Sequence, residues 1–231
     1  MGWDTEFHGV DVRAQSCVAR SVCHVFSLAI PTADRLPRGH HDSRTYVVDG
    51  ALLAHPGVRA WFEDPSVTKP CHNQPVDAHT LRNAGVRVAG AVNTLDMARY
   101  FYPEWREDGG FSLDECGKRL LGLGKAEDFE ELLGYDAVEY VETPRTRKLC
   151  WCGDFTCRRR KAPHDVKREV QDVVVTTRTV RKTIPLPDLS PAHRLWPRYL
   201  AYAARDAVVA LGVWERLSAD TRERGYPWTR F

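Results

Sequence analysis

Alternating apolar and polar positions in the first fifty residues predict β-strands. Residues 4–7, 21–30 and 45–49 are rich in β-branched and aromatic side chains, and Pro31 and Gly50 end the second and third of these segments. Strands that follow one another along the chain often pair with their neighbours. The pattern therefore predicts an antiparallel meander at the start of the chain.

Helical spacing of apolar positions dominates most of the remaining sequence. Ser112 and Glu115 form a capping box at the start of one helix, and Gly122 is placed to end it. A short strand is expected over residues 67–71. Helices are predicted over residues 55–62, 75–84, 94–102, 112–121 and 197–217. Strands followed by mixed strands and helices predict an α/β domain built in layers.

Residues 143–191 interrupt this pattern. They contain a cysteine cluster, a basic run over residues 158–161, a β-branched run over residues 173–177 and a proline-rich stretch over residues 184–191. We interpret them as an arm or hairpin inserted in one domain that covers residues 1–231, not as a second full domain.

Composition narrows the class of protein. With 231 residues, 43% of them apolar, the chain can bury a sizeable core, which excludes a disordered tail or a small disulfide-held scaffold. The longest apolar stretches, such as residues 207–213, are much shorter than the ~20 residues of a membrane span, and the polar residues 1–6 do not resemble a signal peptide. We expect a cytoplasmic protein with no membrane partner. In that setting seven cysteines indicate reduced thiols or metal ligands.

Four acidic residues occupy positions where a carboxylate is costly unless it has a partner. Asp4 and Glu6 lie two apart on a predicted strand, so both side chains face the same side. Asp206 interrupts the apolar stripe of the last predicted helix, one turn after Tyr202. Asp77 lies on the apolar face of its helix.

Each acid also has a simpler interpretation. Asp77 could be a first-turn acid stabilised by the helix dipole, Asp4 and Glu6 could be solvated, and Asp206 could pair with Arg205 or with a distant arginine. The combination favours a functional site, because converging carboxylates are ligands for hard cations such as Mg²⁺ or Mn²⁺.

The order of three segments carries a family resemblance. Asp4-Thr-Glu6, His72-Asn-Gln-Pro-Val-Asp77-Ala-His79 and Tyr202-Ala-Ala-Arg-Asp206 resemble the three exonuclease motifs of the DEDDy-type 3′→5′ exonucleases, a branch of the ribonuclease-H-like superfamily. That branch includes the proofreading domain of family A DNA polymerases and ribonuclease D. The resemblance covers residues 3–142 and 197–217, and residues 112–122 resemble the helix between the second and third motifs.

The sequence departs from the pattern of this family at a few positions. Only three residues precede Asp4, Val76 stands where an aromatic residue is common, and Asn93 stands where an aspartate often begins the next segment. None of these departures removes an expected ligand.

The resemblance implies a ribonuclease-H-like exonuclease fold, a mixed central sheet flanked by helices, with two Mg²⁺ or Mn²⁺ ions. In that reading Asp4 bridges both ions, Glu6 and Asp206 complete the site of the ion that activates water, Asp77 holds the second ion, and Tyr202 orients the water. Further substrate contacts are expected from residues near the first two motifs: Phe7, His8 and Asn73.

The arm suggests separate chemistry. Its thiols and imidazole offer the ligand set of a structural Zn²⁺ site: Cys150, Cys152, Cys157 and His164. The one-residue spacing of the first two cysteines departs from the usual spacing, so buried or free reduced thiols stay an alternative. Three adjacent arginines could track the backbone of a nucleic-acid strand, or could simply be a solvated face: Arg158, Arg159 and Arg160.

These features lead to three hypotheses about function. The first is a stand-alone, phage-encoded metal-dependent 3′→5′ exonuclease, which acts on 3′ ends of single-stranded or frayed DNA, on its own or in trans to a polymerase. The second is an exoribonuclease similar to ribonuclease D. The third is a nucleic-acid binding module with a vestigial exonuclease fold.

Overall fold

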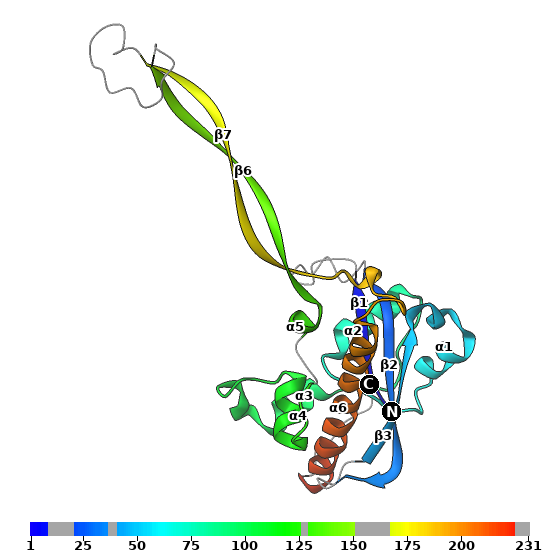
Figure 1. The fold of residues 1–231 in the computed structure, drawn as a ribbon. Helices are drawn as coiled ribbons and strands as arrows, with labels where there is room; N and C mark the ends of the chain where they lie inside the picture. Colours follow the sequence, from blue (N-terminus) through cyan, green and yellow to red (C-terminus); the bar gives the residue numbers. More distant parts are fainter. Residues whose placement is uncertain (9–20, 37–40, 126–128, 151–166, 225–231) are drawn as a thin grey trace. The chain divides into compact units, whose positions relative to one another are not determined.

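The computed structural model describes residues 1–8, 21–36, 41–125, 129–150 and 167–224 (Figure 1). Its contacts divide the chain into two compact units. The larger unit combines Met1–Leu133 with Ile184–Phe231, and the smaller one is Gly134–Thr183.

A three-stranded antiparallel sheet forms the centre of the larger unit. The strands β1 (Gly2–His8), β2 (Val22–Arg35) and β3 (His41–Asp49) lie in the order β1-β2-β3. The register between β1 and β2 shifts between Glu6 and Phe7, which marks a β-bulge or irregularity at the end of the first motif. The predicted meander is therefore confirmed.

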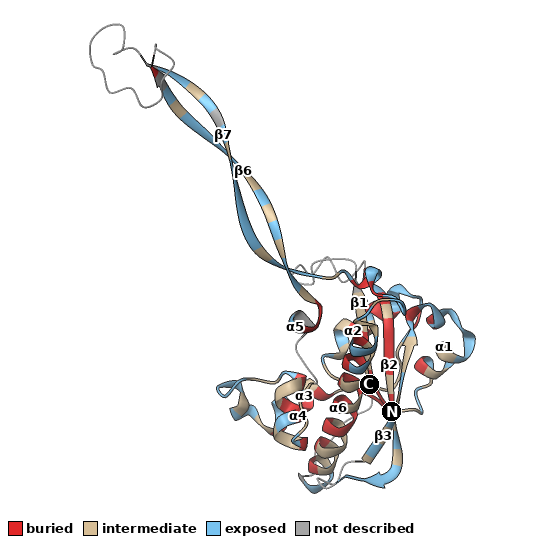
Figure 2. Ribbon diagram, viewed as in Figure 1, coloured by how far each residue is buried: buried red, intermediate tan, exposed pale blue. Residues whose placement is uncertain are grey.

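Helices cover both faces of this sheet. On one face Trp3 of β1 belongs to a buried cluster with Phe62 of α1 (Pro56–Glu63), and Leu81 of α2 (Gln74–Asn83) joins it. On the other face β2 packs against α6 (Trp196–Arg224), whose sheet-facing residues are buried (Figure 2). A short 3-10 helix over Gly50–Ala54 links β3 to α1. This arrangement confirms a mixed α/β layered domain, while the ribonuclease-H-like assignment stays a prediction.

A second, parallel pair of strands lies beside β1. It consists of β4 (Lys69–Cys71) and β5 (Ala91–Asn93), of which the sequence predicted only the first. The fully buried Lys69 stabilises this region, because its ammonium donates hydrogen bonds to three backbone carbonyls, those of Asp64, Val67 and Ala89. The pair places the end of β4 next to the start of α2.

Three helices enclose a further part of the core. Apolar residues of α3 (Thr94–Phe101) and α4 (Leu113–Leu121) cluster with those of α6. The predicted N-cap of α4 is confirmed, since the Ser112 hydroxyl accepts a hydrogen bond of 3.1 Å from the Glu115 N–H. A 3-10 helix over Pro103–Arg106 connects α3 towards α4, and α5 (Phe129–Leu133) follows α4.

The last helix, α6, is longer than predicted and lies very close to β1. It continues past residue 217 to Arg224, and the Tyr102 hydroxyl donates a hydrogen bond of 2.6 Å to buried Asp220 in this extension. Where α6 approaches β1, a Cβ added to Gly2 would lie only 2.5 Å from the Ala207 carbonyl oxygen. Gly2 is therefore required by the close approach of strand and helix.

The smaller unit is a two-stranded antiparallel ribbon. It consists of β6 (Gly134–Cys150) and β7 (Lys167–Thr183), and it overlaps the arm expected over residues 143–191. Cross-strand ion pairs support it, among them Arg178 with Glu139 at 3.0 Å.

None of the helices in the described part of the chain combines the length and the apolar character that crossing a membrane requires.

Candidate metal centre

Strand β1 presents the first two acids on one face. Asp4 and Glu6 are half-buried, whereas their neighbours Trp3 and Thr5 are buried on the opposite side of the strand. Gly2 shares the face of the two acids, and this is the face that α6 approaches. The alternation expected from the sequence is thus present, and the acids are not simply solvated.

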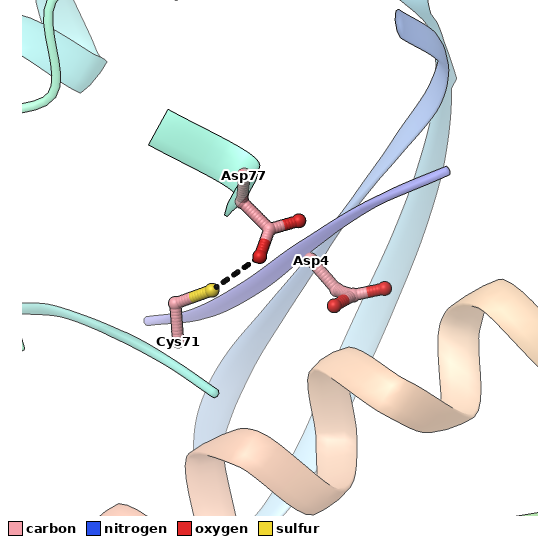
Figure 3. Close-up of side chains that lie close together, drawn as sticks. All are labelled: Asp4, Cys71 and Asp77. Carbon is pink, nitrogen blue, oxygen red and sulfur yellow. Dashed lines mark hydrogen bonds between the residues drawn. The ribbon is translucent and has the colours of Figure 1, made fainter. Parts of the chain in front are cut away.

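Three of the four acids singled out from the sequence gather around the fourth, Asp4. Ligand atoms of Asp4, Glu6 and Asp206 all lie within 4.8 Å of one another, and the same holds for Asp4, Cys71 and Asp77 (Figure 3). We call Asp4, Glu6, Asp77 and Asp206 the acidic centre. It joins residues from β1, α2 and α6, three elements that are far apart in the sequence.

Neutral donors fix the carboxylate of Asp77. Its Oδ1 accepts hydrogen bonds from the Thr5 backbone N–H at 3.1 Å and from the Thr5 hydroxyl, and its Oδ2 accepts one of 3.3 Å from the Cys71 thiol (Figure 3). Asn73 precedes α2 in the left-handed conformation, with φ of 58°, and so turns the chain from β4 into this helix. Asp77 does lie in the first turn of α2, but with 5% of its surface exposed and donors on both oxygens it is more than a first-turn acid stabilised by the helix dipole.

A lysine pairs with Asp206. The Lys125 ammonium lies 2.7 Å from Asp206 Oδ2 and donates a hydrogen bond of 3.1 Å to the Tyr202 hydroxyl oxygen. Arg205, which the sequence offered as a partner, donates instead to the Gly124 carbonyl at 3.0 Å. The buried Oδ1 of Asp206 has no hydrogen-bond partner among the residues that the structure describes.

Burial and mutual repulsion raise the pKa values of the acids. The pKa of Asp4 lies well above its ordinary value because of burial, then of the neighbouring Asp77, Glu6 and Asp206. Burial, followed by Asp206, raises the pKa of Glu6 to about 8. The acidic centre therefore carries more negative charge than its surroundings balance, and this charge is relieved by protons or by cations.

Asp77 and Asp206 differ in which groups oppose the rise of their pKa values. Burial raises the pKa of Asp77 to about 6, although the hydrogen bonds from Thr5 and Cys71 lower it. Burial also raises the pKa of Asp206, and Lys125 opposes this rise. Burial and then the charge of Glu6 raise the pKa of the Tyr202 phenol, which keeps it protonated at neutral pH.

This donor set fits hard divalent cations. It offers carboxylate oxygens on several elements, and the partnerless Oδ1 of Asp206 is a buried acceptor that a cation would satisfy. Oxygen ligands of this kind suit Mg²⁺ and Mn²⁺.

The predicted substrate contacts are only partly within the described residues. Phe7 is half-buried directly after the register shift in β1, and Asn73 is exposed, with its backbone N–H bonded to the Asn93 side chain at 3.0 Å. The side chain of His8 lies outside the description, as do residues 158–160.

The proposed zinc ligands are described at one position only. Cys150 is buried at the end of β6, while Cys152, Cys157 and His164 lie outside the described residues. The zinc site stays a prediction.

Sequence reasoning missed three residues of the site. Thr5 and Cys71 were not among the predicted site residues, although both donate hydrogen bonds to Asp77. Lys125 was not singled out at all. A signal existed for Cys71, which ends the predicted strand just before the second motif, but no local pattern marks Lys125.

Comparison with known proteins gives partial matches. No family model matches the chain. It is 32% identical over 115 residues to "DNA polymerase I B, mitochondrial" of Oryza sativa subsp. japonica, which covers 48% of this chain and 11% of that protein. It is 30% identical over 155 residues to "DNA polymerase I A, chloroplastic/mitochondrial" of Arabidopsis thaliana, which covers 63% of this chain and 14% of that protein.

The chain is thus similar to one part of plant DNA polymerase I proteins, and the matches span between 8% and 14% of the length of these relatives. They support the expected relation to polymerase-associated sequences. The DEDDy branch in particular stays a prediction.

Proposed function

We propose that this protein is a metal-dependent 3′→5′ exonuclease that hydrolyses phosphodiester bonds at the 3′ ends of single-stranded or frayed DNA. The observation that carries the proposal is the gathering of three further carboxylates around that of Asp4, with the Tyr202 phenol linked to Asp206 through one lysine. The similarity to DNA polymerase I proteins supports DNA as the substrate.

In this proposal Asp4, Glu6, Asp77 and Asp206 hold two Mg²⁺ or Mn²⁺ ions. Such ions, when bound, stabilise negative charge on the attacking and leaving oxygens of a phosphodiester. The donor set supports this assignment because hard oxygen ligands surround Asp4 on both sides.

The protein's own groups have distinct parts in the proposed reaction. Tyr202, with its raised pKa, stays a neutral phenol and positions a water molecule by hydrogen bonding; it does not act as a strong base. Thr5 and Cys71 keep Asp77 in one orientation, which restricts where an ion can bind. Phe7 and Asn73 are proposed to contact the terminal nucleotide.

The proposal is tested with 5′-labelled DNA and RNA oligonucleotides of the same sequence, incubated with the protein and Mg²⁺ or Mn²⁺. We expect progressive shortening of the DNA from its 3′ end. The double variant Asp4→Ala/Glu6→Ala should lose this activity and still bind the oligonucleotide, because ligands for the ions are removed while the surface outside the acidic centre is unchanged.

A matched double variant, Glu104→Ala/Glu107→Ala, removes two exposed acids near the 3-10 helix that follows α3 and should retain full activity. Unchanged DNA shortening by the Asp4→Ala/Glu6→Ala protein would overturn the assignment of the site. Shortening of RNA alone would identify an exoribonuclease, and binding without hydrolysis by the unmodified chain would identify a binding module.

A further inference from the structure

One lysine connects Asp206 of the acidic centre with Tyr202 of the same helix. Lys125 lies between α4 and α5, and its ammonium contacts both Asp206 Oδ2 at 2.7 Å and the Tyr202 hydroxyl oxygen at 3.1 Å. An ammonium can only donate hydrogen bonds, so Tyr202 Oη accepts from it and directs its own O–H elsewhere.

The backbone around Lys125 is fastened to the helices on both sides. The Lys125 N–H donates to Asp114 Oδ1 of α4 at 2.8 Å, and Arg205 of α6 donates to the carbonyl of the preceding Gly124 at 3.0 Å. A Cβ added to Gly124 would lie 2.3 Å from Asp114 Oδ1, so a larger residue there would disturb this contact. These contacts hold the backbone of residues 124–125 in place, and so fix the position from which the Lys125 side chain reaches Asp206.

The charge of Lys125 balances only part of the centre. Among the described residues its ammonium pairs with Asp206 alone, through Oδ2, whereas Oδ1 of the same carboxylate is buried without a partner. Ligand atoms of Asp4 and Glu6 lie within 4.8 Å of one on Asp206, so the lysine sits at the edge of the candidate ion site and leaves carboxylate oxygens for a cation.

We propose that Lys125 is a positioning residue of this centre, an inference that rests on the proposed exonuclease function. Its ammonium fixes Asp206 through Oδ2 and Tyr202 through its hydroxyl oxygen. Oδ1 of Asp206 is then left to bind the divalent ion. The proposal has an unusual consequence. Removal of the positive charge should strengthen binding of a divalent cation, because the repulsion is gone, and should slow hydrolysis, because Tyr202 and Asp206 lose their fixed orientation.

The test uses the full chain with Lys125→Met, which keeps an unbranched side chain one atom shorter and without charge, and Lys125→Arg, which keeps the charge. Lys182→Met is the matched control, because Lys182 also pairs with a carboxylate, Glu139 at 3.0 Å, but on the ribbon. The Mn²⁺ dissociation constant is measured by titration calorimetry, and kcat and KM are measured on a single-stranded oligonucleotide.

We expect Lys125→Met to bind Mn²⁺ about 10-fold more tightly and to lose about 10- to 100-fold in kcat with little change in KM. Lys125→Arg should recover much of kcat, and Lys182→Met should behave like the unmodified protein. Opposite changes in ion affinity and turnover are not produced by partial unfolding, which weakens both.

Several results would overturn the inference. An unchanged kcat in Lys125→Met would do so, as would a parallel loss of Mn²⁺ affinity and kcat in both Lys125 variants. If the unmodified chain hydrolyses no nucleic acid, the proposed function fails. In that case, an unchanged Mn²⁺ affinity in Lys125→Met would also overturn the proposed role of Lys125. An unmodified chain that binds no Mn²⁺ would remove both.

Discussion

Asp77 and Asp206 are the two most buried acids of the acidic centre, with 5% and 3% of their surfaces exposed, and they are held in different ways. Asp77 accepts hydrogen bonds on both oxygens, all from neutral groups of Thr5 and Cys71. Asp206 pairs with the Lys125 ammonium on one oxygen and has no described partner on the other.

The difference separates orientation from charge. Neutral donors fix a carboxylate and favour its ionised form, but they add no positive charge to the centre. An ammonium fixes the carboxylate and also adds positive charge. The Asp77 side of the centre therefore depends on a proton or an added cation for charge balance, whereas the Asp206 side brings part of its own.

Replacement of each acid by its amide should give the largest contrast. In EDTA, we expect Asp206→Asn to lower the free energy of unfolding by about 1–3 kcal/mol, because the partly exposed Lys125 ammonium loses its partner. Asp77→Asn should leave this free energy equal or higher, since an amide oxygen can still accept from Thr5 and an unbalanced charge is gone. Urea unfolding measures both, and equal losses in the two variants would contradict the comparison.

The two sides of the centre should also separate by pH. A raised carboxylate pKa means that the folded chain holds the proton more tightly than the unfolded chain, so its stabilising contribution is complete below the unfolded pKa and is lost as pH rises through the folded pKa. For Asp77 we expect this loss near pH 6. For Glu6, which lies beside Asp206, we expect it near pH 8.

Without divalent ions, Tm should therefore fall by several degrees between about pH 5 and about pH 9. Asp77→Asn should flatten the lower part of this fall and Glu6→Gln the upper part, as followed by thermal melts in EDTA. A Tm that rises over the same range would show that the charges of the centre are balanced in another way.

The thiol at the Asp77 side should have the smallest effect. Cys71→Ala removes one neutral donor and should cost about 0.5–1.5 kcal/mol from the lost hydrogen bond, with an added cost for the small cavity. Cys71→Ser keeps a donor and should lose less than Cys71→Ala, whereas Cys116→Ser, at a buried thiol in the α3, α4 and α6 cluster, should show no such advantage over Cys116→Ala. Urea unfolding in EDTA compares the four variants, and the same ranking at both sites would argue against a specific bond to Asp77.

Much of the fold could be predicted because its signals are local. The alternation of Asp4 and Glu6 on β1 and the Ser112 cap of α4 depend on residues next to one another in the chain, and both are present in the structure. The convergence of the four acids was predicted from the order of three segments, which reflects a family resemblance more than any local pattern.

What could not be predicted depends on contacts between distant segments. Lys125 becomes part of the site only because Asp114 and Arg205 hold its loop from two helices. The three residues of β5 pair with β4 without a clear strand pattern of their own, and the extension of α6 contains Asp220, which accepts a hydrogen bond from the distant Tyr102. Such contacts appear only when the chain has folded.

The close approach at Gly2 has a consequence for how this site can vary. Gly2 shares a strand face with Asp4, and its Cα lies against the carbonyl of Ala207, the residue next to Asp206. Any side chain at this position would push β1 away from α6. The acidic centre would then widen although none of its four acids had been replaced. The width of the centre, and with it the size of ion that it suits, thus depends on a residue that has no functional group.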